Sequence, residues 1–281
     1  MLLPQQPTAP YNMSIALLLH EQENAAFHRV YFFGPFRLFR GSAPCELRWR
    51  RNKAKSLLKW FILNQGKLFS ADQLIDLFWP DMPLESASKN LYVTIHYLRH
   101  LLEPELTSGQ QSSFIRRNAN NFYWFEMDES WWVDVVSLHH LLDHARELDR
   151  HGEATKAAFY YQKVVSYCER GFLSEDSYEE CFQVYRQQYD LHFSQALTRL
   201  IQIYLQQNDL ERVLEYAHQA LQVDPYCEQA AYAIARAHFL QGNLPKALKQ
   251  LDNFYSFLQE ELGLEPSEEF RLLRKTITRG R

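Results

Sequence analysis

The sequence predicts a mostly α-helical protein with a small β component, and three observations support this. Residues 30–39 and 114–126 are rich in aromatic residues and contain turn residues, which is typical of short paired strands. Between residues 51 and 104, apolar residues recur at helical spacing. In the second half, two segments match at an offset of 34 residues, the period of tetratricopeptide helix pairs. Together these patterns predict a winged helix-turn-helix domain followed by an all-α tetratricopeptide-like domain.

The length and composition are consistent with two folded domains. The chain has 281 residues, of which 46% are hydrophobic, so it can bury a core in each half. We place the winged domain at residues 28–127 and the helical domain at residues 132–281. Residues 1–27 contain three prolines near the start and are expected to form a flexible N-terminal extension.

The formal net charge of −4 conceals two halves of opposite sign. Residues 28–125 hold 14 Lys and Arg against 7 Asp and Glu, whereas residues 126–281 hold 16 against 25. A basic half joined to an acidic half indicates one part that meets phosphate and one that does not. Chance clustering of charge is the alternative explanation.

The winged domain is predicted to begin with paired strands. Val30–Phe39 is interrupted by Gly34-Pro35, so it reads as a hairpin or as two short strands. A helix follows from about Arg51 and closes at Gln65-Gly66. The next helix opens at Ser70, where the Ser-x-x-Gln spacing is typical of a capping box.

A third helix and a second hairpin complete the predicted winged domain. The helix begins near Leu84 or Glu85 and ends at Leu102-Glu103-Pro104. The hairpin spans residues 114–126 and turns at Asn118–Asn121, where asparagines tolerate positive φ. The expected buried stripe of the third helix is Leu91, Ile95, Leu98 and Leu102.

The second half is helical in pattern and carries an internal repeat. Residues 208–214 match residues 242–248, and residues 152–158 form a weaker copy. Helical arrays of this kind supply surface for partners rather than catalytic groups.

Eight short motifs resemble one family of bacterial regulators. Those of the first half are Phe33-Gly-Pro-Phe36, residues 49–58, Leu77-Phe-Trp-Pro-Asp81 and residues 90–99. Those of the second half are residues 133–135, residues 171–178, Asp224-Pro225 and residues 262–267. In this order, over roughly residues 30–275, they resemble the SARP group (Streptomyces antibiotic regulatory proteins). That group joins an OmpR/PhoB-type winged helix to a bacterial transcriptional activation domain.

The resemblance implies a sequence-specific, DNA-binding transcriptional activator. Its expected partners are double-stranded DNA, a second copy of the chain bound beside it on repeated promoter sites, and RNA polymerase. The chain departs from the family at His96-Tyr97 in the third helix and in the glycine-free turn of the hairpin. A tetratricopeptide adaptor with a vestigial winged helix is the alternative function.

The third helix is the candidate reader of DNA, because an α-helix fits the major groove. By family likeness we expect Asn90 to pair with adenine, Val93 and Thr94 to touch a thymine methyl group, and Arg99 to bind phosphate with Lys89. A solvated surface helix is the alternative. The predicted outer face is Lys89, Asn90, Tyr92, Val93, Thr94, His96 and Tyr97.

Five residues outside this helix are further candidates for DNA contact. Arg116 and Arg117 alternate sides on a strand, so only one of them can face the groove. Trp79 is either a phosphate contact through its indole N–H or a core anchor. Arg50 and Arg51, at the start of the first helix of the winged domain, are expected to touch the DNA backbone; the alternative is that they only solvate that face of the helix.

The sequence argues against an enzyme. It contains neither a G-x-x-x-x-G-K-[ST] loop nor a G-x-G-x-x-G loop to cradle phosphate. His140 and His144 are four residues apart but lack further ligands nearby, so we expect no metal and no cofactor. No apolar run is long enough to cross a membrane. The four scattered cysteines suggest reduced thiols in a cytoplasmic protein.

Overall fold

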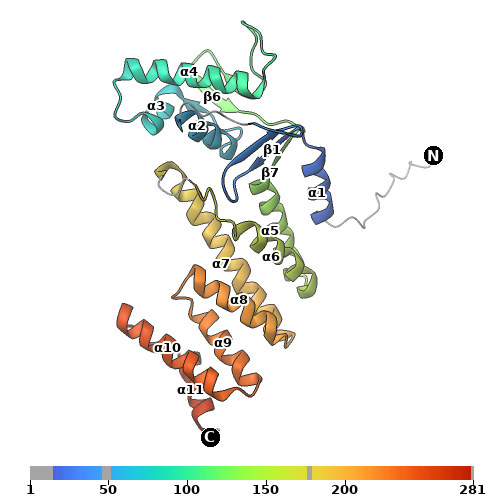
Figure 1. Ribbon diagram of the computed structural model, residues 1–281, viewed down its shortest axis with the longest axis vertical. Helices are drawn as coiled ribbons and strands as arrows, with labels where there is room; N and C mark the ends of the chain where they lie inside the picture. Colours follow the sequence, from blue (N-terminus) through green and yellow to red (C-terminus); the bar gives the residue numbers. More distant parts are fainter. Residues whose placement is uncertain (1–14, 46–51, 176–178, 280–281) are drawn as a thin grey trace, which may run out of the picture.

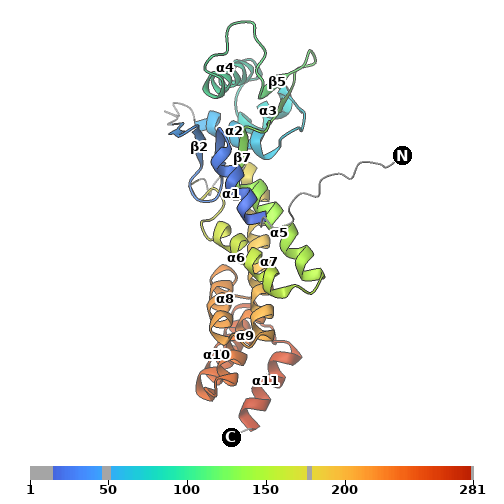
Figure 2. The ribbon, with the colours of Figure 1, turned by 90° about the vertical axis from the view of Figure 1, so that its right-hand side faces the viewer.

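The computed structural model describes residues 15–45, 52–175 and 179–279. The molecule is elongated, with the winged domain at one end and the helical domain at the other (Figures 1 and 2). The elements of the first half are α1 (Ile15–Ala25), β1 (His28–Tyr31), β2 (Arg37–Arg40), β3 (Ala43–Pro44), α2 (Asn52–Leu63), β4 (Phe69–Ser70), α3 (Ala71–Phe78), α4 (Leu84–Leu102), β5 (Ile115–Arg117), β6 (Phe122–Phe125) and β7 (Trp131–Val133).

The first sheet has the strand order β3-β2-β1-β7. Strands β1 and β2 pair antiparallel, which confirms two short strands around Gly34-Pro35. Gly34 has φ +86°, a backbone conformation that residues with a Cβ rarely adopt, so glycine suits this turn. Strand β7, which follows the second hairpin and leads directly into the helical half, pairs parallel with β1. The first sheet therefore already includes a strand from the segment that joins the two halves.

The rest of the winged domain follows the predicted order of helix, helix, helix and hairpin. The capping box at α3 is confirmed, because Ser70 Oγ accepts from the Gln73 N–H at 3.1 Å and Gln73 Oε1 accepts from the Ser70 N–H at 2.8 Å. Strands β4, β6 and β5 form a second sheet. Phe61, Phe78 and Phe125 are buried between these helices and strands. The predicted winged helix is confirmed.

In the described part of the helical half, residues 134–175 and 179–279, three helix pairs are followed by a final helix. The two copies of the predicted repeat begin α8 and α10 in the same way. The side chains of Asp209 and Asn243 cap these helices, each accepting a hydrogen bond from the backbone N–H of the residue three positions later. The helices pair in chain order, and α11 packs against α10 (Figure 1). The elements are α5 (Asp134–Arg150), α6 (Ala154–Cys168), the 3₁₀ turn η1 (Glu180–Phe182), α7 (Gln183–Gln206), α8 (Leu210–Val223), α9 (Glu228–Leu240), α10 (Leu244–Leu262) and α11 (Glu268–Arg279).

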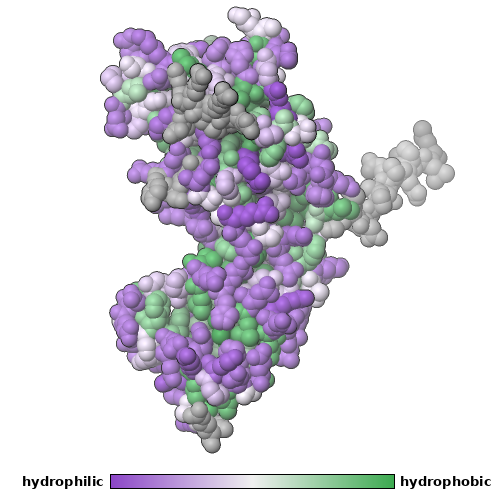
Figure 3. All heavy atoms as spheres, viewed as in Figure 1, coloured by the Kyte–Doolittle hydropathy of each residue, from purple (hydrophilic) through white to green (hydrophobic). Residues whose placement is uncertain are grey.

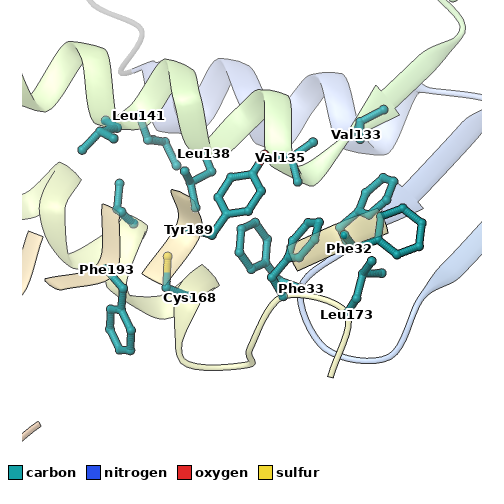
Figure 4. Close-up of a cluster of buried hydrophobic side chains, with 14 of the residues drawn as sticks. Phe32, Phe33, Val133, Val135, Leu138, Leu141, Cys168, Leu173, Tyr189 and Phe193 are labelled. Carbon is teal, nitrogen blue, oxygen red and sulfur yellow. The ribbon is translucent and has the colours of Figure 1, made fainter. Parts of the chain in front are cut away.

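One hydrophobic core runs across the junction between the two halves. Figure 4 shows Phe32 and Phe33 of the winged domain beside Val135, Leu173 and Tyr189 of the helical half. All these side chains are buried, so the junction is a packed interface rather than a flexible linker.

Asp134, the first residue of α5, forms hydrogen bonds across this junction. Its Oδ2 accepts hydrogen bonds from the backbone N–H groups of Phe32 at 2.7 Å and Phe33 at 2.9 Å. Complete burial raises the pKa of the Asp134 carboxyl to about 7, although these N–H groups favour the ionised form. A side chain of the helical half therefore satisfies buried backbone donors of the winged domain.

The expectation that residues 1–27 form a flexible extension is wrong for its second part. Residues 15–25 form α1, which packs against β7 and α5 and buries Leu19. The Tyr31 hydroxyl also donates to Glu23 at 2.6 Å. The apolar run at the start of α1 is too short to be stable alone, so its helix depends on the surface that β7 and α5 provide. Residues 1–14 lie outside the described part of the chain.

Candidate nucleic-acid interface

Helix α4 lies at the free end of the winged domain, far from α11 at the other end of the molecule (Figures 1 and 2). Glu85 lies in its first turn and Arg99 and His100 in its last, which suits the helix dipole. The predicted stripe is confirmed by burial, since all its members are at most 3% exposed: Leu91, Ile95, Leu98 and Leu102. This stripe fixes which side of α4 faces away from the core.

The outward side of α4 carries polar and aromatic residues. Tyr92 is 46% exposed and Val93 is 48% exposed. Asn90 is partly buried, and its Nδ2 lies 2.9 Å from Met82 Sδ. The residues of the predicted face that are exposed are Lys89, Tyr92, Val93, His96 and Tyr97. This side of α4 presents the donors, acceptors and apolar groups that base edges in a major groove match.

Thr94 is a correction to the predicted face. Its exposure is only 2%, so it cannot touch a thymine methyl group as expected. Thr94 lies three residues after Leu91 and four before Leu98, and residues at these spacings share one side of a helix. Its hydroxyl therefore belongs to the inner side of α4.

Lys89 is held only weakly in the free protein. Its Nζ lies 2.7 Å from Glu85 Oε1 one turn earlier, and the two side chains are 74% and 84% exposed. An ion pair this exposed contributes little free energy, so exchanging the carboxylate for a phosphate costs little.

The turn of the second hairpin is built from asparagines instead of glycine. Asn118 Oδ1 accepts from the backbone N–H groups of Asn120 and Phe122, each at 3.0 Å. Asn121 has φ +60°, a left-handed conformation that asparagine adopts more readily than most residues. These contacts explain how the turn forms without glycine.

The two arginines of β5 have different surroundings. The Nε of Arg116 lies 2.8 Å from Glu126 Oε2, so its charge is paired within the hairpin. Arg117 instead lies beside α4, where its Nη2 donates to the Tyr92 hydroxyl at 2.9 Å. Of the two, Arg117 is the one that adjoins the outward side of α4.

Arg99 links α4 to the hairpin. Its Nε donates to the carbonyl oxygen of Ile115 at 2.9 Å, and burial lowers the pKa of its guanidinium. The side chain is partly buried, so it supports the base of the hairpin as well as being a predicted phosphate contact.

The remaining candidates lie elsewhere. Trp79 is 8% exposed and packs edge-on against Phe78, with ring centroids 6.1 Å apart, which favours the core-anchor alternative. Arg50 and Arg51 lie outside the described residues, so their predicted contact with DNA stays a prediction.

Basic residues of α2 face the helical half. Lys55 forms an ion pair with Glu175, and Lys59, whose side chain is 1% exposed, lies 3.6 Å from the same carboxylate. The Ser56 hydroxyl donates to Glu179 at 2.6 Å. Burial is the main reason that the pKa of Lys59 falls to about 8, and the nearby Lys55 lowers it further. Part of the basic charge of the first half therefore pairs with carboxylates of the helical half at the junction.

Sequence reasoning missed three residues near this interface. His100 packs edge-on against His96, with ring centroids 4.4 Å apart. Asn121 and Tyr123 both contact the guanidinium of Arg117. The spacing of four residues between His96 and His100 was a usable signal, whereas the contacts of Tyr123 depend on the fold.

The exposed side of α4, the adjoining hairpin and the tetratricopeptide-like half together define a winged-helix transcriptional regulator. Residues 133–278, more than half of the chain, match the family described as bacterial transcriptional activator domain. Residues 50–119 match the family described as transcriptional regulatory protein, C terminal. The chain belongs to the bacterial transcriptional activator domain family, and its resemblance to the SARP group is confirmed.

Solved structures agree with this fold. EmbR of Mycobacterium tuberculosis, solved in complex with a low-affinity phosphopeptide, is similar with a TM-score of 0.74 and 16% identity. The match covers 91% of this chain and 66% of EmbR, so this chain spans just under two thirds of that protein. Comparison with curated proteins finds no matching sequence.

Two tetratricopeptide domains are more distant matches. The C-terminal domain of an FK506-binding protein of Plasmodium falciparum has a TM-score of 0.40 and 16% identity, covering 52% of this chain and 89% of that one. The Sgt2 domain of Aspergillus fumigatus has a TM-score of 0.36 and 17% identity, covering 51% and 78%.

Within residues 15–45, 52–175 and 179–279, no helix is long and apolar enough to cross a membrane. The same residues hold no group of three or more His, Cys, Asp or Glu side chains placed to bind a metal ion. His144 instead packs edge-on against Tyr160, with ring centroids 4.6 Å apart.

Proposed function

We propose that this regulator is a sequence-specific DNA-binding activator that inserts α4 into the major groove. The observation that carries the proposal is the outward side of α4, where Lys89, Tyr92, Val93, His96 and Tyr97 are exposed beside Arg117 of the hairpin. A helix of 19 residues with this composition suits base edges, and the flanking cations suit phosphates.

Within this face, the residues divide by role. Asn90 pairs with a base edge and Val93 contacts a thymine methyl group. Lys89 and Arg117 bind phosphate on either side of the groove. Arg99 is partly buried beneath the hairpin, so it extends less far from α4 than Lys89 and Arg117 do when it contacts the DNA backbone.

The helical half is proposed to bind RNA polymerase and a second copy of the chain on repeated promoter sites. Residues 126–281 carry 16 basic and 25 acidic residues, a balance that disfavours phosphate. Hydrophobic side chains are exposed among hydrophilic ones over this half (Figure 3). The exposed hydrophobic residues of this half include Val184, Leu191 and Leu240. One winged helix makes a small contact with DNA, so two copies side by side raise occupancy through effective concentration.

The first experiment is binding of the full chain to a pool of random duplexes at increasing salt. If about 6 phosphates are contacted, affinity should fall about a thousandfold between about 50 and 200 mM salt. Selection from the same pool should enrich a repeated motif. Absent or salt-insensitive binding would reject the proposal and favour a tetratricopeptide adaptor.

The second experiment separates DNA binding from activation. Aspartate and alanine substitutions at exposed hydrophobic positions of the helical half are compared in a reconstituted transcription system with the enriched duplex. Loss of transcription with retained binding is expected. Transcription unaffected by every such variant would remove this half from the activation mechanism.

A further inference from the structure

The guanidinium of Arg117 is held by three neighbours beside α4. Its Nη2 donates to the Tyr92 hydroxyl at 2.9 Å, and its Cζ lies 5.1 Å from the centroid of the Tyr92 ring. Its Nε donates to Asn121 Oδ1 at 3.0 Å, and Asn121 Oδ1 also accepts from Nη2. On another side, Cζ lies 5.6 Å from the centroid of the Tyr123 ring. Both α4 and the hairpin therefore determine where this cation sits.

We propose that Tyr92 is a positioning residue that orients Arg117 for a DNA phosphate, rather than itself reading a base. This inference rests on the proposed function and assigns roles within the same interface. The Tyr92 hydroxyl accepts a hydrogen bond from Arg117, and the Tyr92 ring lies within cation–π distance of the guanidinium. The phenol therefore acts on DNA through the arginine.

Preorganisation is the physical reason for this arrangement. An unrestrained arginine loses rotamer entropy when it binds, whereas one already held by three hydrogen bonds and two rings loses less. The Nη1 atom of Arg117 makes no hydrogen bond within the described part of the chain, so its two N–H donors remain for an incoming oxygen. The charge is fixed in place while part of its donor capacity is kept free.

Arg116 provides the contrast within the same strand. It pairs with Glu126 at 2.8 Å and donates to the carbonyl oxygen of Ser113 at 3.2 Å. Arg117 is held by neutral partners, so its positive charge is not cancelled by its immediate neighbours. Of these two arginines of β5, Arg117 is the one that combines a fixed position with a charge that no carboxylate pairs.

The neighbouring turn adds to the positioning. Asn121, at the end of the hairpin turn, has φ +60°, and its side-chain oxygen accepts a hydrogen bond from Arg117. Backbone conformations of this kind persist where surrounding contacts require them. The turn therefore places an acceptor where the guanidinium needs one.

A double-mutant cycle on the full chain tests the inference. The variants are Tyr92→Phe, Arg117→Ala and the pair, with the duplex enriched by the wild-type protein as probe. Tyr92→Phe removes one hydroxyl and should weaken binding roughly 3- to 10-fold. In the Arg117→Ala background the same change should have almost no effect, because the partner of the hydroxyl is gone.

The salt dependence provides a readout that a purely structural role would not change. Arg117→Ala should lower the slope of log affinity against log salt by about 1, and Tyr92→Phe should lower it by less. Melting temperatures of all variants should match the wild type. Tyr97→Phe is the matched control, since it removes an exposed phenol on the same helix and its effect should add to that of Arg117→Ala.

The possible results distinguish a wrong role for Tyr92 from a failure of the proposed DNA binding. If Tyr92→Phe weakens binding equally in both backgrounds, Tyr92 contacts DNA itself and the inference is wrong, while DNA binding stands. A lowered melting temperature for Tyr92→Phe would shift the test to Arg117→Lys, which keeps the charge and should reproduce the loss. Full affinity in Arg117→Lys would also overturn the inference. If the wild-type protein enriches no duplex, the proposed function fails and the inference fails with it.

Discussion

Two groups of basic side chains in the winged domain have opposite surroundings. Lys55 and Lys59 of α2 face Glu175 of the helical half, and Lys59 is buried. Lys89 of α4 and Arg117 of the hairpin are exposed at the free end of the molecule. The net charge of the domain counts all four alike, so charge alone does not locate a DNA-binding surface. Packing separates the cations that join the two halves from those that stay exposed and are proposed to bind phosphate.

The largest effect is expected at the junction, from Asp134→Ala. The substitution removes the acceptor of two buried N–H groups, those of Phe32 and Phe33. The free energy of unfolding should therefore fall by about 2–4 kcal/mol. Chemical denaturation of the full chain measures this. Asp134→Asn keeps a carbonyl acceptor and should lose much less. Equal stability of Asp134→Ala and wild type would show that the junction does not depend on this carboxylate.

Lys59 should make the stability of the junction depend on pH. Its folded-state pKa is about 8, whereas an unfolded lysine titrates near 10.4. Between these values the unfolded chain binds more protons, so the Lys59 contribution to stability rises with pH, by up to about 1.4 kcal/mol per pH unit. Lys59→Met should remove this rise in denaturation curves between about pH 8 and 10. Lys89→Met, the exposed control, should leave the rise intact.

Asn90→Ala should change base preference at one position by about 1–3 kcal/mol. The reason is the loss of an amide from the outward side of α4. Selection from a random duplex pool, compared with wild type, measures the change. Thr94→Val is the control on the inner side and should leave base preference unaltered. A preference changed by Thr94→Val and not by Asn90→Ala would reverse the assignment of the two sides.

The smallest effect contrasts Lys89→Ala with Lys55→Ala. Lys89→Ala should weaken binding to all duplexes alike, by about 1 kcal/mol or less, with the salt slope reduced by about 1. Lys55→Ala should leave DNA affinity and slope unchanged, because its charge pairs with Glu175. Fluorescence anisotropy at several salt concentrations distinguishes them. A larger loss for Lys55→Ala would mean that α2, and not only α4, faces the duplex.

The candidate site was predictable to the extent that it depends on helical spacing. The stripe of Leu91, Ile95, Leu98 and Leu102 indicated which way α4 faces, and Tyr92 and Tyr97 are exposed as that orientation requires. Thr94 was misplaced because it lies at the edge of the stripe. At such a position, the width of the surface packed against the helix decides burial, and that surface comes from distant segments.

The sequence by itself determined the features that depend on neighbours a few residues apart. These are the capping box at Ser70, the helix order of the winged domain and the repeated helix starts at Leu210 and Leu244. Hydrogen bonds and apolar spacing within one or two turns leave a local pattern that can be read directly.

Only the tertiary structure decided the features that join distant segments. Strand β7 pairs with β1, α1 is stable against β7 and α5, and Asp134 binds the backbone of Phe32 and Phe33. The burial of Lys59 likewise depends on Glu175, far along the chain. Whether a lysine meets a carboxylate or a phosphate is set by which surfaces pack together, because hydrophobic burial and desolvation act between segments that no local pattern connects.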